Sequence, residues 1–154
     1  MLIEQVLIGG RVYPDGTATT SWSIDLHFPD PRNSELFPGI EFKSIAKFTA
    51  LYPYPIPFWC QDSKNISNLM MAARDISVSN IALGTVLVMR TTGIMGEVIG
   101  MAASICKNEK TNPGGVYKNY FSKMEKLMEV GVGNPDLPKI QNYNLGETLQ
   151  KNKP

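Results

Sequence analysis

The longest apolar run, residues 81–106, constrains this sequence most strongly. Only Arg90 and Glu97 interrupt it with charge. A charged side chain at the centre of a bilayer costs about 2.5–3.5 kcal/mol on insertion scales. We therefore interpret the run as a buried core element and expect no membrane span.

Most of this run predicts a long helix over about residues 91–107. Small residues recur along one side of it, at Gly93, Gly96, Gly100 and Ala103. Each glycine costs a helix interior about 1 kcal/mol relative to alanine. This side indicates close approach of the backbone, either to a cofactor or to a sheet.

A second, amphipathic helix is predicted over about residues 113–130. Asn112 is a favourable N-cap, and Pro113 suits the first helical position. Apolar side chains then recur at helical spacing up to Met128, and Gly131 ends the pattern.

The first third predicts antiparallel strands, beginning with Val6–Ile8. Residues 21–28 alternate, with Trp22 on the predicted core face and Asp25 and His27 on the polar face. A further strand is expected over residues 42–52.

Two later segments differ from these alternating strands. Tyr52–Trp59 carries proline at every second position, which predicts an irregular extended segment and excludes a central strand. Asn68–Ala73 reads as a strand buried on both faces. Antiparallel strands, one returning strand and two helices define an α+β fold.

Composition excludes several classes of function. The formal net charge is +1 with acids and bases interspersed, which predicts neither nucleic-acid nor membrane binding. A single histidine argues against a metal site. Cys60 and Cys106 suggest a reducing compartment or simple burial. Residues 1–4 show no signal peptide, so a cytoplasmic location is the default expectation.

Five segments, in this order, resemble a bacterial family of FAD-dependent oxidoreductases: Trp22–His27, Tyr54–Phe58, Asn68–Ser77, Ile81–Gly84 and Met89–Ala103. The resemblance covers about residues 2–133. The family is similar to the glutathione-reductase-like flavoproteins, and some members are described as xanthan-lyase-related.

The resemblance implies two segments. Residues 1–62 would end a substrate-binding domain, and residues 63–133 would return to the FAD-binding domain. Residues 134–154 are polar and rich in proline and asparagine, which predicts a polar tail.

The resemblance also implies site residues. The long helix would direct its N-terminus at the flavin, and the returning strand would end near the ribityl chain. The implied cofactor-binding residues are Arg74, Asp75, Thr91, Thr92 and Gly93. Asp25 and His27 are the catalytic candidates, and Tyr54, Phe58 and Trp59 are the substrate candidates.

Four positions depart from the family pattern. The family usually carries glycine where Ala73 stands, arginine where Trp59 and Leu87 stand, and histidine where Asn80 stands. These departures bear on catalysis more than on fold.

The sequence contains no GxGxxG, the loop that anchors the ADP half of FAD in such flavoproteins. We therefore expect a C-terminal fragment that is inactive and retains no FAD alone. Such a fragment is expected to self-associate. The alternatives are a subunit of a split flavoenzyme, which joins a separately encoded N-terminal FAD-binding half, or a glycan-binding module that uses the aromatic side chains of Tyr52–Trp59.

Overall fold

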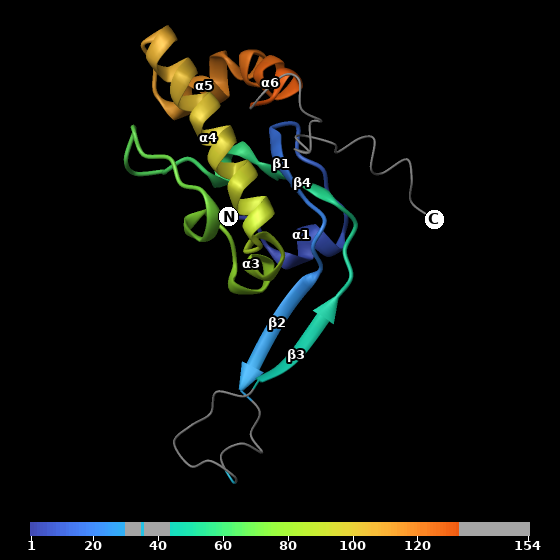
Figure 1. Cartoon of the computed structure of the whole chain (residues 1–154). Helices are drawn as coiled ribbons and strands as arrows, with labels where there is room; N and C mark the ends of the chain where they lie inside the picture. The colour runs from blue at the N-terminus through green and yellow to red at the C-terminus, as the bar shows by residue number, and fades with distance from the viewer. Residues whose placement is uncertain (30–34, 36–43, 133–154) are drawn as a thin grey trace.

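The computed structural model describes residues 1–29, residue 35 and residues 44–132, and it confirms an α+β fold (Figure 1). The predicted polar tail at residues 134–154 lies outside the described residues. The helices and strands are α1 (Glu4–Ile8), β1 (Gly16–Thr20), β2 (Ile24–Pro29), β3 (Ser44–Thr49), β4 (Tyr54–Pro57), α3 (Asn80–Val86), α4 (Met89–Glu109), α5 (Pro113–Asn119) and α6 (Phe121–Val130), with short 3-10 helices η1 (Phe58–Cys60) and η2 (Ala73–Asp75).

Strands β1 and β4 form a buried antiparallel pair in the body of the protein. Their register joins Gly16 to Pro57 and Thr20 to Tyr54. The prolines are tolerated because a strand in a two-stranded sheet has one edge that donates no ladder hydrogen bond. The expectation of an extended, non-central segment is confirmed, although β4 is more regular than predicted.

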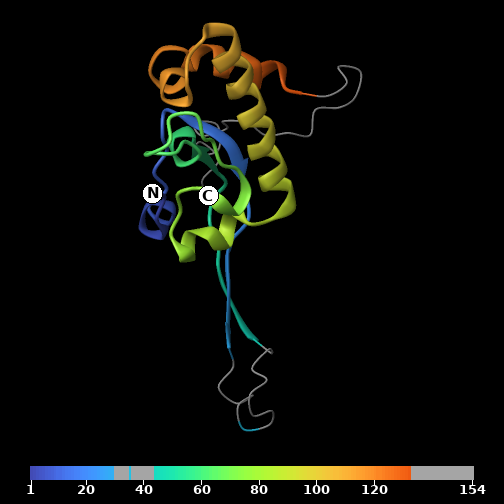
Figure 2. The same cartoon turned by 90° about the vertical axis from the view of Figure 1, so that its left-hand side faces the viewer.

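Strands β2 and β3 form a second antiparallel pair that projects from the body as a ribbon (Figures 1 and 2). Among the ribbon side chains whose burial the structure describes, the buried one is Ile24 at the base, which is 2% exposed. Trp22 precedes β2 and is 46% exposed. The prediction that Trp22 lies in the core is therefore wrong, because alternation cannot show how far along a strand the body extends.

Helix α4 runs alongside the β1–β4 pair and contacts α5 and α6 (Figure 1). The observed bounds exceed the predicted 91–107 at both ends. One side of α4 is buried in the core: Ile94, Met95, Val98, Met101, Ala102 and Ile105. The interpretation of residues 81–106 as a core element is confirmed for this side.

No single helix in the described part of the chain is both long and apolar enough to cross a membrane. The pair α3 and α4, bent by 90°, meets the criteria of length and composition only when the two are taken together.

Helix α3 approaches β2 at backbone distance. A Cβ atom added to Gly84 would lie 2.8 Å from the Asp25 carbonyl oxygen and 3.1 Å from the Asp25 amide nitrogen. Backbone atoms cannot rotate away as a flexible side chain can. Glycine at this position therefore fixes how the base of the ribbon meets the body.

Two predicted strands are wrong in the structure. Residues 4–8 form α1, and residues 68–73 contribute only an isolated bridge between Met70 and Asp62. A short apolar run becomes a strand only where neighbouring strands supply partners, and residues 68–73 have none beyond that bridge in the described chain.

The second predicted helix is divided in two. Asn112 caps α5 as expected, accepting a hydrogen bond from the Gly115 amide at 2.8 Å. The chain leaves helical geometry at Tyr120, with φ −129° and ψ 15°, and α6 begins at the next residue. The apolar spacing continues across this break, so periodicity alone could not reveal it.

Ala73 has a φ of 65°, in the left-handed region that glycine adopts without steric penalty. We expect Ala73→Gly to raise the free energy of unfolding by about 1 kcal/mol, because removal of the Cβ relieves this strain. Chemical denaturation of both proteins measures the difference. Equal or lower stability of the variant would show that the surrounding contacts, and not the Cβ, determine the energy at this position.

Candidate functional site

The predicted flavin-facing residues Thr91, Thr92 and Gly93 lie in the first two turns of α4, which begins at Met89. Thr91 is only 3% exposed and belongs to the buried side of the helix. The hydroxyl of Thr92 donates to the carbonyl of Met89 at 2.9 Å. Gly93 is exposed, so of these three residues it presents the most accessible backbone.

No side chain caps this helix end. The residue before α4 is Val88, which makes no side-chain capping hydrogen bond. The first amides of a helix lack intrahelical acceptors, and they form the positive end of the helix dipole. The end of α4 can therefore stabilise negative charge on a group placed against it.

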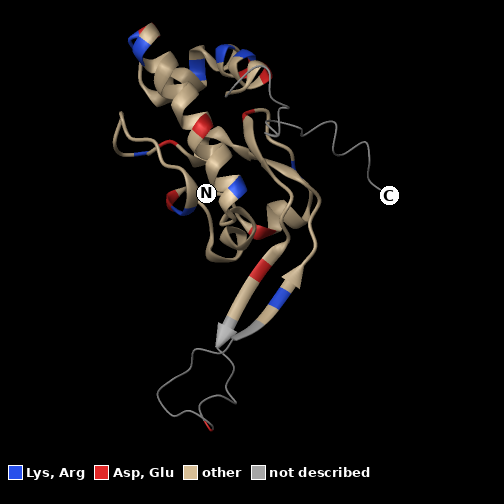
Figure 3. Cartoon of the chain, viewed as in Figure 1, with Lys and Arg blue, Asp and Glu red and all other residues tan. Residues whose placement is uncertain are grey.

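The small residues of α4 lie on the side opposite the core. Apart from the adjoining residues and the backbone of α4 itself, no heavy atom of the described residues lies within 4 Å of a Cβ built at Gly93, Gly96 or Gly100, and Ala103 is exposed. Between Arg90 and Lys107 the only charged residue is Glu97, which leaves most of this helix uncharged in Figure 3. We call Gly93, Gly96, Gly100 and Ala103 the glycine face. The alternative prediction, that this face packs tightly on a sheet, is wrong for the described part of this chain.

Arg74 and Asp75 lie on η2 and are exposed. The η2 segment contacts both α3 and α4. The structure thus brings together the two elements that carry the predicted cofactor-binding residues. A direct contact of Arg74 or Asp75 with the cofactor stays a prediction.

Asp25 and His27 form a carboxylate–imidazole pair on β2. The Asp25 Oδ1 atom lies 3.1 Å from His27 Nε2, and the side chains are 17% and 58% exposed, respectively. Gly84 holds the backbone of Asp25 against α3, which leads directly into α4. A partly buried carboxylate beside an accessible imidazole is an arrangement that can move a proton. Sequence reasoning missed Gly84 as a support of this pair, although Ile81–Gly84 was among the resembling segments.

The predicted substrate aromatics lie mostly in the interior. Tyr54 is 7% exposed, and its hydroxyl pairs with the Thr85 hydroxyl. Phe58 is fully buried, with its ring centroid 6.0 Å from that of Phe121. These two side chains pack in the hydrophobic core. Their contact with a substrate stays a prediction.

Trp59 is half-buried and packs edge-on against Tyr13, with ring centroids 5.9 Å apart. Its backbone amide donates to Asp15 Oδ2 at 3.1 Å. Burial raises the pKa of the Asp15 carboxyl above its ordinary value, and the Trp59 amide opposes that rise. This hydrogen bond fixes the start of η1 against the turn before β1.

Both cysteine thiols are free, and Cys60 is buried. Burial raises the pKa of the Cys60 thiol to about 12, which makes it unreactive at neutral pH. The described residues contain no group of three or more histidine, cysteine, aspartate or glutamate side chains arranged to hold a metal ion.

The remaining departures from the family pattern lie near the junction of α3 and α4. Leu87 connects the two helices and is 42% exposed, and Asn80 is exposed at the first position of α3. The family pattern would place a cation and an imidazole here.

A family model described as FAD dependent oxidoreductase matches residues 1–128. No curated protein matches the chain. No solved structure matches it either.

Proposed function

This chain belongs to the FAD dependent oxidoreductase family, and we propose that it supplies the C-terminal part of such an enzyme. It acts together with a separately encoded flavin-binding half. Alone it is inactive and does not retain FAD. The glutathione-reductase-like arrangement, with α4 directed at the flavin, is part of this proposal.

The exposed glycine face of α4 carries the proposal. An interior glycine in a helix costs about 1 kcal/mol relative to alanine, and the described residues give Gly93, Gly96 and Gly100 no packing role. A role outside the described chain accounts for them, since a bare backbone allows a cofactor or a neighbouring helix to approach closely.

The residues present fit one part of FAD and not the other. The uncapped N-terminus of α4 and the open backbone at Gly93 suit the electron-rich end of a flavin ring. The sequence has no GxGxxG to hold the pyrophosphate. FAD, when bound, supplies a two-electron acceptor, while Asp25 and His27 are the groups of this chain placed to hold or move a proton.

The partner half would also cover apolar side chains near the start of α4. Met89 is 90% exposed, Leu87 42% and Ile81 39%. Large apolar patches are uncommon on monomers. When the chain is purified alone, the same surface favours self-association.

The flavin content of the purified protein tests the proposal. Expressed alone, the chain is expected to lack the visible absorbance of flavin and to scatter light as an oligomer. Purified by a tag from its native cells, it should carry flavin together with a polypeptide that contains GxGxxG. One tightly bound FAD per chain in the protein expressed alone would contradict the proposal.

The glycan-binding alternative has less support. Of the four aromatic side chains in Tyr52–Trp59, Tyr54 and Phe58 are buried, which leaves Tyr52 and the half-buried Trp59 for stacking on a sugar.

A further inference from the structure

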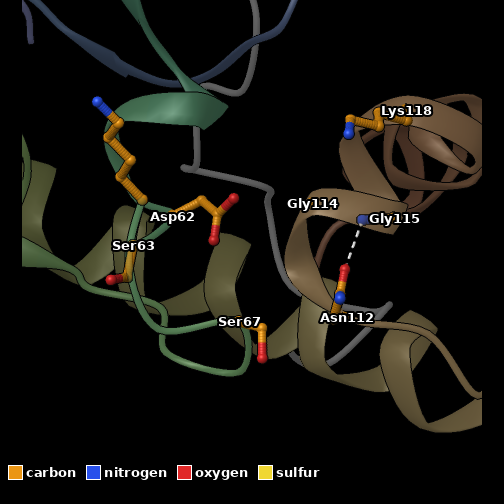
Figure 4. Close-up of a pocket in the computed structure, with 8 residues that line it drawn as sticks. Asp62, Ser63, Ser67, Asn112, Gly114, Gly115 and Lys118 are labelled. Carbon is orange, nitrogen blue, oxygen red and sulfur yellow. Dashed lines mark hydrogen bonds between the residues drawn. The ribbon is translucent and has the colours of Figure 1, made fainter.

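A polar cleft of about 330 Å³ lies between residues 62–67 and the start of α5 (Figure 4). The lining side chains include Lys64 and Lys118, the hydroxyl of Ser67 and the carboxylate of Asp62. The cleft contains none of the residues assigned above to flavin, catalysis or substrate. It is therefore a feature that the proposed function leaves unexplained.

Asp62 is the most unusual group in the cleft. Its Oδ1 atom is buried without a hydrogen-bond partner among the described residues. Burial raises the pKa of this carboxyl, and the Ser63 amide opposes that rise. A buried acceptor without a donor costs about 1–3 kcal/mol, so a donor supplied by a ligand would be stabilising.

The opposite wall is shaped by α5. Figure 4 shows the Asp62 side chain directed toward Gly114, with Lys118 on the α5 side. A Cβ at Gly114 would lie 3.8 Å from Asp62 Oδ2, so the absence of a side chain at Gly114 leaves space beside this carboxylate. The side-chain oxygen of Asn112 accepts a hydrogen bond from the Gly115 amide. The side-chain nitrogen of Asn112 is a donor group on the lining of the cleft.

The two lysines and the carboxylate line one cleft without pairing to one another. In the described part of the chain, neither Lys64 nor Lys118 forms an ion pair with Asp62, since neither ammonium nitrogen lies within 4.0 Å of an Asp62 carboxylate oxygen. The cleft thus presents separated cations and a separated acceptor. A ligand matches it best when it carries an anionic group and a hydroxyl group together.

We propose that this cleft binds a small hydroxylated anion, whose phosphate or carboxylate lies between Lys64 and Lys118 and whose hydroxyl donates to Asp62. Lysine ammonium groups are effective charge partners for such anions. A hydroxyl is the donor that an ionised carboxylate requires. The site goes beyond the flavin chemistry proposed above, and neither proposal depends on the other.

Amide chemical shifts of the isotope-labelled full chain test the proposal, with glycerol phosphate, inorganic phosphate and glycerol as probes. Glycerol phosphate is expected to produce saturable shifts at Ser63, Ser67, Gly114 and Gly115. Lys118→Gln should weaken its binding about tenfold, the effect of removing one charge-assisted contact worth about 1.4 kcal/mol. Lys126→Gln, at an exposed lysine on α6 outside the cleft, should leave binding unchanged.

Asp62→Asn separates the hydroxyl contact from charge attraction. The variant should bind glycerol phosphate more weakly, because an amide is a poorer hydrogen-bond acceptor than a carboxylate. It should bind inorganic phosphate more tightly, because a carboxylate that repels the anion is removed. Several results would overturn the proposal: no saturable shift, equal loss in Lys126→Gln, a gain for both anions in Asp62→Asn, or inorganic phosphate binding the unchanged protein as tightly as glycerol phosphate.

Discussion

Phe58→Ala is expected to lower the free energy of unfolding by about 3–5 kcal/mol, the usual cost of truncating a buried aromatic side chain. Phe58 is fully buried and packs edge-on against Phe121 of α6. It therefore joins η1, which follows β4, to α6. Chemical denaturation followed by circular dichroism measures the loss.

Trp22→Ala is the matched control for this large aromatic truncation. Trp22 is 46% exposed and lies outside the strands, so its removal should change stability by no more than about 1 kcal/mol. If Trp22→Ala costs more than Phe58→Ala, the ribbon packs against the body differently from the structure described above.

Gly84→Ala is expected to lower the free energy of unfolding by about 3 kcal/mol, at the upper end of the usual range for overpacking. The added methyl group would meet two backbone atoms of Asp25 at 2.8 and 3.1 Å. Helix α3 and β2 must then separate, which displaces the Asp25–His27 pair as well.

Gly93→Ala is the control for this effect in a second helix. Its Cβ would meet no described atom within 4 Å, so the better helix propensity of alanine should raise stability by up to about 1 kcal/mol. A Gly84→Ala protein as stable as the unchanged chain would mean that α3 and β2 do not approach at backbone distance.

The sequence correctly predicted the elements whose conformation depends on interactions between residues close together in the chain. Asn112 and Pro113 mark the start of α5. Asn112 caps the helix, and Pro113 lacks an amide hydrogen at a position where the helix makes no use of one. The long apolar run predicted α4 because its buried side repeats with helical spacing. Prolines predicted an extended segment at β4 because each fixes its own φ and restricts the residue before it.

Elements that depend on distant partners were predicted less well. Val6–Ile8 is apolar enough for a strand, yet it belongs to α1. The bridge between Leu2 and Val78 ties the start of α1 to the segment before α3. Residues 68–73 have the composition of a buried strand without neighbouring strands in the described chain. Short apolar runs do not specify their own partners, so periodicity could not decide either case.

The candidate site shows the same division. The sequence indicated that something approaches the small residues of α4, and it placed Asp25 and His27 on one strand face, where the structure finds them 3.1 Å apart. It could not show that the glycine face points away from the core. It also could not reveal the contact of Gly84 with Asp25, because that contact joins two distant segments.

The paired substitution Gly96→Ala and Gly100→Ala tests the central claim most directly. Neither Cβ would meet a described atom within 4 Å, so the chain alone should gain about 2 kcal/mol of stability from helix propensity. The account predicts that this more stable protein, purified by a tag from its native cells, loses both flavin and the GxGxxG-containing polypeptide that accompany the unchanged chain. A variant that gains stability and still carries both at the original stoichiometry would contradict the assignment of the glycine face as the flavin-side surface.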